Sequence, residues 1–145
     1  MKKLFLSLLS LCPLLAWAGD YPCVYLNMRI KNQTQSTCHL IGLELLSGIV
    51  RTINDIPLVI SEGEISNRFV VTESTFNPLD LVLTYECGAN KIVRFESQKG
   101  LCRQHATVDG TVLVSTNLDA KFEASNGLYW DNKPGTITWT LTDIS

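Results

Sequence analysis

The feature that most limits how this chain can fold is an alternation of apolar and polar residues with a period of two. The clearest example is the segment 136–142, in which Ile137, Trp139 and Leu141 alternate with four threonines. Successive side chains of a β-strand point to opposite faces, so this pattern is typical of a strand with one buried face. A helix would carry these β-branched threonines on every side, which restricts their side chains. The segment therefore predicts a strand.

The same alternation recurs along most of the chain, in the segments 24–30, 41–45, 81–86, 92–96 and 119–124. Only residues 40–53 also fit a helix, and Gly42 and Gly48 disfavour that interpretation. About nine short strands, spaced by roughly 10–15 residues, are typical of antiparallel sandwiches and barrels. Two facing sheets would bury the inward Leu, Val, Ile, Phe and Trp side chains in one core. We therefore predict an all-β, single-domain antiparallel β-sandwich over residues 19–145.

Short turn-forming sequences separate these segments. Asp109-Gly110 and Asn126-Gly127 are each typical of a two-residue hairpin turn between paired strands. The sequence 87–90 is predicted to join two antiparallel strands. Four aromatic residues fall on inward faces of the predicted strands and are expected in the core: Phe69, Phe95, Phe122 and Trp139.

The first 18 residues have the three parts of a secretory signal peptide. Lys2 and Lys3 are followed by an apolar run over 4–15 and by Ala16-Trp17-Ala18, so cleavage is predicted before Gly19. The run is shorter than the roughly 20 residues that span a bilayer. The pattern predicts a bacterial protein exported to the periplasm or secreted. The alternatives are an N-terminal core helix, or lipidation at Cys12 in a loose lipobox over residues 9–12.

Composition excludes several classes of protein. With 46% hydrophobic and 18% charged residues, the chain is too apolar for a disordered protein. Removal of Lys2 and Lys3 leaves ten basic residues against 14 acidic residues, a formal net charge of −4. A mildly acidic chain without a basic cluster is not expected to bind nucleic acid, because phosphates need a concentrated basic face. No later segment is long and apolar enough for a transmembrane helix.

Four cysteines remain after the signal: Cys23, Cys38, Cys87 and Cys102. An even number in an exported chain predicts two disulfides. Both local spacings are 15 residues, which favours Cys23–Cys38 with Cys87–Cys102. The pairings 23–102 with 38–87, and 23–87 with 38–102, stay open. The cysteines and histidines lack the close spacing of zinc ligands and there is no C-x-x-C motif, so neither a metal nor a cofactor is expected.

No catalytic constellation is visible in the sequence. A G-x-S-x-G elbow, a phosphate-binding glycine loop and a calcium loop are absent. His39 and His105 are isolated and fit surface positions better than catalytic ones. The carboxylate pairs Glu62 with Glu64 and Asp119 with Glu123 resemble glycosidase pairs, but alternate residues on a solvent face look the same. A small secreted hydrolase therefore remains only an alternative.

The segment 125–135 is the best candidate for a binding site. Consecutive aromatic residues, Tyr129 and Trp130, are followed by Asp131 and Asn132, between the breaks at Asn126-Gly127 and Pro134-Gly135. In extended backbone the two rings point to opposite faces, so one would join the core and the other would face solvent. An exposed ring beside hydrogen-bonding groups is typical of loops that stack on sugars or contact lipid headgroups. The simpler interpretation is a core aromatic followed by a turn.

The first half of the exported chain resembles secreted aegerolysin- and actinoporin-like proteins. The resemblance rests on Ile30 to Thr34, on Leu43 to Gly48, on Pro57 to Gly63 and on Phe69. It implies a β-sandwich and a protein that binds membrane lipids, with pore formation in some members. This chain departs from those proteins because it has no amphipathic helix before the first strand and no obvious cluster of exposed aromatics on one loop.

Together these observations predict a non-enzymatic binding protein that engages a cell-surface glycan, lipid or protein. The alternative within this class is a membrane-active protein of the aegerolysin type. The sequence does not specify the ligand or an oligomeric state.

Overall fold

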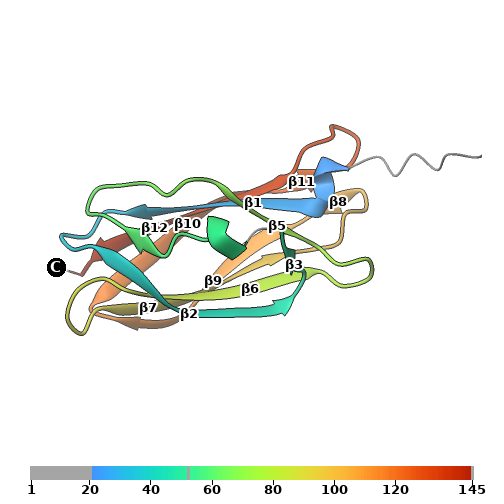
Figure 1. The fold of residues 1–145 in the computed structure, drawn as a ribbon. Coiled ribbons are helices and arrows are strands. Elements are labelled where there is room, and N and C mark those ends of the chain that lie inside the picture. Colours follow the sequence, from blue (N-terminus) through green and yellow to red (C-terminus); the bar gives the residue numbers. More distant parts are fainter. Residues whose placement is uncertain (1–20, 52, 145) are drawn as a thin grey trace, which may run out of the picture.

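A computed structural model describes residues 21–51 and 53–144 (Figure 1). The predicted signal peptide and Cys12 lie outside the described residues. The elements in chain order are η1 (Pro22–Val24), β1 (Tyr25–Asn32), β2 (Cys38–Ser47), β3 (Ile49–Val50), η2 (Ile53–Asp55), β4 (Val59–Ile60), β5 (Phe69–Thr72), β6 (Leu79–Glu86), β7 (Ile92–Lys99), β8 (His105–Ala106), β9 (Val108–Thr116), β10 (Leu118–Ser125), β11 (Gly127–Leu128) and β12 (Gly135–Asp143).

Ten of these strands form two five-stranded sheets that face each other as two layers (Figure 1). One sheet has the order β10-β12-β1-β5-β3 and the other the order β4-β2-β6-β7-β9, while β11 and β8 form a small separate pair. The predicted all-β sandwich is thus confirmed. The described residues contain twelve strands rather than about nine, because β3, β4, β8 and β11 have only two residues each, too few for alternation to reveal.

One pairing in the sandwich is parallel. Strands β1 and β12 run in the same direction, with Leu26 opposite Gly135 and Asn32 opposite Leu141. No hairpin joins these two strands, which lie near the two ends of the sequence, so nothing in the connection forces an antiparallel arrangement. The other strand pairs in the described residues are antiparallel.

Aromatic side chains fill the space between the sheets. The Phe95 ring stacks on Trp139 at 4.4 Å between centroids and on Tyr85 at 6.2 Å. The indole Nε1 of Trp139 donates a hydrogen bond of 2.8 Å to the buried Ser97 hydroxyl. Phe69, Phe95 and Trp139 are fully buried, as predicted, but Phe122 is partly exposed because β10 is the edge strand of its sheet.

Neither predicted Gly hairpin forms. Asp109 and Gly110 lie inside β9, where a Cβ at Gly110 would approach the Trp139 ring to 2.6 Å. This glycine therefore serves close packing rather than a turn. Asn126 separates β10 from β11, but these two strands do not pair with each other. Strand β10 pairs with β12 and β11 pairs with β8, so no hairpin turn forms at Asn126-Gly127 either. The turn after Cys87 does join the antiparallel strands β6 and β7, as predicted.

The disulfides are Cys23–Cys102 and Cys38–Cys87, so the favoured local pairing is wrong and one of the open alternatives is present. The physical reason is that β1 and β2 belong to different sheets. Cys23 precedes β1 and Cys38 begins β2, so most of the length of β1 separates them. Cys38 and Cys87 instead lie at the adjacent ends of the paired strands β2 and β6, with Cα atoms 4.0 Å apart.

Candidate functional site

A short hairpin projects from one end of the sandwich between β11 and β12 (Figure 1). Leu128 and Lys133 exchange backbone hydrogen bonds of 3.0 Å in both directions, and Asn132 N–H donates to the Tyr129 carbonyl. Asn132 has a φ of 54°, in the left-handed region that asparagine tolerates better than most residues. The chain therefore turns over residues 129–132, which are the four residues predicted from the sequence to bind a ligand.

The rings of this turn form an exposed aromatic cluster. Trp130 is 79% exposed and meets Tyr129 edge to face at 5.2 Å between centroids. Tyr129 in turn stacks on the exposed ring of Tyr21 at 5.3 Å, and a hydrogen bond between their hydroxyl groups raises the pKa of Tyr129. The expectation that one of the two consecutive rings would join the core does not hold, because the backbone there is a turn rather than extended.

Polar groups surround the base of the hairpin. A recess of about 500 Å³ beside it is lined by Ser125, Asn126, Leu128, Lys133, Pro134 and Thr136. Asp131 and Asn132 are exposed at the tip. The structure therefore places an apolar ring, an ammonium group and amide and carboxylate oxygens within one six-residue hairpin.

A second exposed aromatic residue, which the sequence analysis missed, lies in the loop between β5 and β6. Phe76 is 84% exposed. Figure 1 shows this loop at the same end of the sandwich as the hairpin. The available signal was a lone aromatic residue in a turn-forming sequence, because Thr75 precedes it and Asn77-Pro78 follow it. We call Tyr21, Phe76, Tyr129 and Trp130 the aromatic end.

A disulfide and a buried ion pair brace the loops of the aromatic end. Cys23–Cys102 joins η1 to the loop after β7. Glu73, at the start of the Phe76 loop, accepts a 2.6 Å bond from Lys99 Nζ and a 2.9 Å bond from the Cys102 N–H. The Lys99 side chain is fully buried, and burial lowers its pKa, opposed by the nearby Glu73 carboxylate. The disulfide and these hydrogen bonds thus connect the segment before β1, the loop after β7 and the Phe76 loop to one another.

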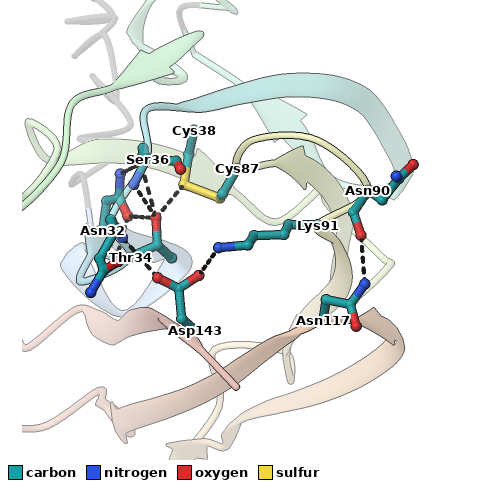
Figure 2. A network of polar contacts seen from close by, with 10 residues as sticks. Asn32, Thr34, Ser36, Cys38, Cys87, Asn90, Lys91, Asn117 and Asp143 are labelled. Atoms are coloured by element: carbon teal, nitrogen blue, oxygen red, sulfur yellow. Dashed lines mark hydrogen bonds and ion pairs between the residues drawn. A yellow bond between two sulfur atoms is a disulfide. The ribbon is translucent and has the colours of Figure 1, made fainter. Parts of the chain in front are cut away.

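A polar network closes the opposite end of the sandwich, where Figure 2 shows the Cys38–Cys87 disulfide. The buried Asn32 amide donates to the carbonyls of Ser36, Ile60 and Ser61, and its Oδ1 accepts from Thr34. Beside it, Lys91 and Asp143 form an ion pair of 2.6 Å, and Gln35 N–H also donates to Asp143. The side-chain nitrogen and oxygen of Asn32 are thus engaged within the protein, and we interpret this network as structural.

The isolated histidines lie at the surface. His39 on β2 is opposite Glu86 on β6, and both line a shallow recess of about 280 Å³ together with Ser36. Among the described residues, no hydrogen bond joins these three side chains, and the Ser36 N–H donates to Thr34 Oγ1. His105 is exposed on β8, opposite Leu128. The described residues contain no group of three or more metal-ligating side chains.

The predicted carboxylate pairs are also at the surface. Glu64 accepts a hydrogen bond from the Ser61 N–H, and Asp119 forms an exposed ion pair with Lys121 at 3.5 Å. Glu123 lies on the same outer face of β10 as Asp119, two residues beyond Lys121. The described part of the chain has no helix long and apolar enough to cross a membrane.

Comparison with known proteins detects similarity only at the level of structure. No family model and no curated protein matches the sequence. The structure of IP-1A from Alcaligenes faecalis matches with a TM-score of 0.56 and 14% identity, over 86% of this chain and 94% of that chain. RahU, solved in complex with TRIS, matches with a TM-score of 0.57 and 14% identity, over 86% and 98%.

The lipid-binding protein Nakanori is a further structural match, with a TM-score of 0.57 and 12% identity, over 81% of this chain and 70% of that chain. At these identities the likeness shows a shared fold and nothing more. A β-sandwich common to a lipid-binding protein agrees with the fold implied by the resemblance to aegerolysin-like proteins.

Proposed function

We propose that this protein is a non-enzymatic binding protein that docks on membrane lipids through its aromatic end. One observation carries the proposal: two large aromatic side chains, Trp130 and Phe76, are about four-fifths exposed on separate loops at the same end of the molecule. Exposed apolar groups gathered in one region are typical of interaction sites rather than of ordinary surface. Tryptophan and tyrosine in particular favour the interface between lipid and water.

The surrounding groups suit a phospholipid headgroup. A ring cluster can contact a quaternary ammonium group by cation–π attraction. The Lys133 ammonium group can donate to a phosphate, and the Asp131 carboxylate is an acceptor for an ammonium group. The fold shared with a lipid-binding protein supports the same choice.

The charge of the chain indicates which lipids are favoured. Acidic residues outnumber basic ones over the sequence, so attraction to a negatively charged membrane is not the driving force. Burial of the rings is then the main contribution, and we infer a preference for zwitterionic phosphocholine surfaces. Because apolar burial is not screened by salt, binding should change little with ionic strength.

Vesicle co-sedimentation tests the proposal. The chain would be expressed with its own N-terminal segment, purified from a bacterial periplasm and mixed with phosphatidylcholine vesicles at low and high salt. Wild-type protein is expected to sediment with the vesicles in both conditions. Trp130→Ala and Phe76→Ala should each weaken binding by tenfold or more, because loss of a buried ring costs roughly 1.5–3 kcal/mol.

Leu58→Ala is the matched control, since Leu58 is also strongly exposed but lies before β4, away from the aromatic end. Thermal midpoints of all variants should stay close to that of the wild type. Wild-type protein that fails to sediment, or ring variants that bind as well as Leu58→Ala, would contradict the proposal. Dye release from the same vesicles distinguishes surface docking from pore formation.

A cell-surface glycan is the second candidate ligand, because Trp130 stands beside the amide and carboxylate of Asn132 and Asp131. Binding to a glycan array that is lost in Trp130→Ala, with no vesicle binding, would favour this alternative over the lipid surface.

A further inference from the structure

The outer face of the sheet β10-β12-β1-β5-β3 has a recess that the proposed function does not use. Its volume is about 530 Å³, and its walls come from β1, β12 and β10, which are neighbours in this sheet. Thr140 lies at its centre, five residues beyond the start of β12 at Gly135. The recess is therefore separate from the hairpin of the aromatic end, which precedes β12.

Two lysines flank Thr140 in the register of the sheet. Lys31 on β1 is directly opposite Thr140, and Thr140 is directly opposite Lys121 on β10. All three residues line the recess. Neighbouring strands are about 4.8 Å apart, so the Cα atoms of the two lysines are separated by about 10 Å. Because lysine has a long flexible side chain, both ammonium groups can reach one ligand above the Thr140 hydroxyl.

These lysines differ from the lysines that stabilise the fold. Lys91 and Lys99 each have a carboxylate partner at 2.6 Å. Lys31 has no ion-pair partner in the described part of the chain. The only partner of Lys121 there is Asp119 at 3.5 Å, and both side chains are strongly exposed. Such exposed pairs are weak, so the Lys121 ammonium group can turn toward a ligand in the recess.

The other groups of the recess suit a ligand that carries hydroxyl groups as well as negative charge. Glu123 lines the recess, and its carboxylate repels a simple anion but accepts hydrogen bonds from hydroxyl groups. The Gln33 amide and the Thr142 hydroxyl also line it and can each donate and accept. At the edge of the sheet the recess is lined by Phe122, which is 37% exposed. An aromatic ring of this kind can pack against the apolar face of a sugar.

We propose that this recess binds an acidic sugar residue, one that carries a carboxylate or phosphate group beside free hydroxyl groups. Lys31 and Lys121 hold the anionic group above the Thr140 hydroxyl. The Glu123 carboxylate and the Gln33 amide bond to sugar hydroxyl groups. A neutral sugar would leave both ammonium groups without a partner, and a simple anion would meet the Glu123 carboxylate without compensation.

The sequence alone could not reveal this site. Lys31 and Lys121 are far apart in the chain, which shows no basic cluster. They come together because β1 and β10 pair with opposite edges of β12.

NMR titration of the isotope-labelled, exported protein tests the inference. The probes are glucuronic acid, glucose 6-phosphate, glucose and inorganic phosphate. Glucuronic acid or glucose 6-phosphate, or both, should shift the backbone amide signals of Lys31, Lys121 and Thr140. Whichever of the two binds more tightly identifies the preferred anionic group. Glucose and inorganic phosphate should bind more weakly by about fivefold or more, since each lacks one half of the recognised chemistry.

Single substitutions test the roles of the residues. Lys31→Gln and Lys121→Gln should each weaken binding of the preferred acidic sugar by about fivefold, the value of an exposed charge contact. Thr140→Val keeps the shape of the side chain and should also weaken binding. Arg103→Gln is the matched control, because Arg103 is exposed in the loop after β7 and does not line the recess.

Circular dichroism of each variant reports whether it is folded, and the exposed Lys121→Gln variant decides the result if another variant is not. Wild-type protein that responds to neither acidic sugar overturns the inference. So does inorganic phosphate that binds as tightly as glucose 6-phosphate, or a folded Lys121→Gln variant that binds like the wild type. Signal shifts confined to residues 129–133 would place the sugar at the aromatic end and also overturn it. No vesicle enters these measurements, so this inference and membrane docking fail independently.

Discussion

At the scale of single residues, the buried ion pair between Lys99 and Glu73 is the contact whose loss should lower stability most. Lys99 is fully buried and the Glu73 side chain nearly so, and the Lys99 ammonium group donates to the Glu73 carboxylate and the Gly100 carbonyl. Breaking such a pair leaves one charge buried without compensation, at a cost of about 3–5 kcal/mol. Glu73→Gln should therefore lower the free energy of unfolding by about that amount in a denaturant titration.

A double variant separates the effect of the unpaired charge from that of the lost contact. Lys99→Met with Glu73→Leu replaces both charges by apolar groups of similar size, and such replacements are often close to neutral. We expect the double variant to be more stable than Glu73→Gln. If it were the less stable of the two, the ion pair itself would be strongly stabilising, and our explanation of the cost would be wrong.

Asp143 gives a prediction about acid stability. The hydrogen bond from Lys91, with a further one from the Gln35 N–H, lowers its pKa below the ordinary value of 3.8. A carboxylate whose pKa is depressed by folding stabilises the native state above that ordinary value, and this contribution is lost as the pH falls through the folded-state pKa. Asp143→Asn should therefore be less stable than the wild type near neutral pH, and the difference should vanish in acid.

Urea unfolding at a series of pH values measures this difference. Asp119→Asn serves as the control, because the Asp119 carboxylate has only an exposed partner at 3.5 Å. A stability gap between wild type and Asp143→Asn that stayed constant down to strongly acidic pH would contradict the assignment.

At the scale of elements, the two disulfides should contribute similarly to the free energy of unfolding, but they lie at opposite ends of the sandwich. They join residues 79 and 49 positions apart, and the loss of unfolded-chain entropy corresponds to about 4 kcal/mol for each. Only Cys23–Cys102 holds loops of the aromatic end. Paired Ser substitutions at Cys23 and Cys102 should therefore reduce vesicle binding, whereas paired substitutions at Cys38 and Cys87 should lower stability by a similar amount and leave binding intact.

Vesicle co-sedimentation, carried out well below the unfolding temperatures of both disulfide variants, compares their binding. Equal losses of binding would show that stability alone, and not the position of the bridge, determines binding.

The same elements show what sequence can reveal. Alternation identifies long strands such as β12 because one of its faces is buried along its whole length. Alternation does not indicate which sheet a strand joins. The disulfide partner of Cys23 depends on this, because β1 and β2 belong to different sheets. The hairpin at 129–132 could be located because its turn residues are local in sequence. Phe76 could not, since the β5–β6 loop comes to the same end of the molecule as the hairpin only when the two sheets assemble.

At the scale of the whole molecule, the sandwich has two unlike ends and one uncovered side. The end with Cys38–Cys87 is closed by a polar network (Figure 2), while the rings of Trp130 and Phe76 are exposed to solvent at the aromatic end. Docking through one end leaves the edge strand β9 along the side of the molecule.

Tryptophan fluorescence tests membrane docking most directly, because the described residues contain one exposed tryptophan, Trp130, and one fully buried tryptophan, Trp139. On addition of phosphatidylcholine vesicles we expect the emission to shift to shorter wavelength and to be quenched by lipids with brominated chains. Trp130→Phe should retain the emission of Trp139 and lose both responses. Emission of the wild type that is unchanged by vesicles, or responses that persist in Trp130→Phe, would contradict docking through the aromatic end.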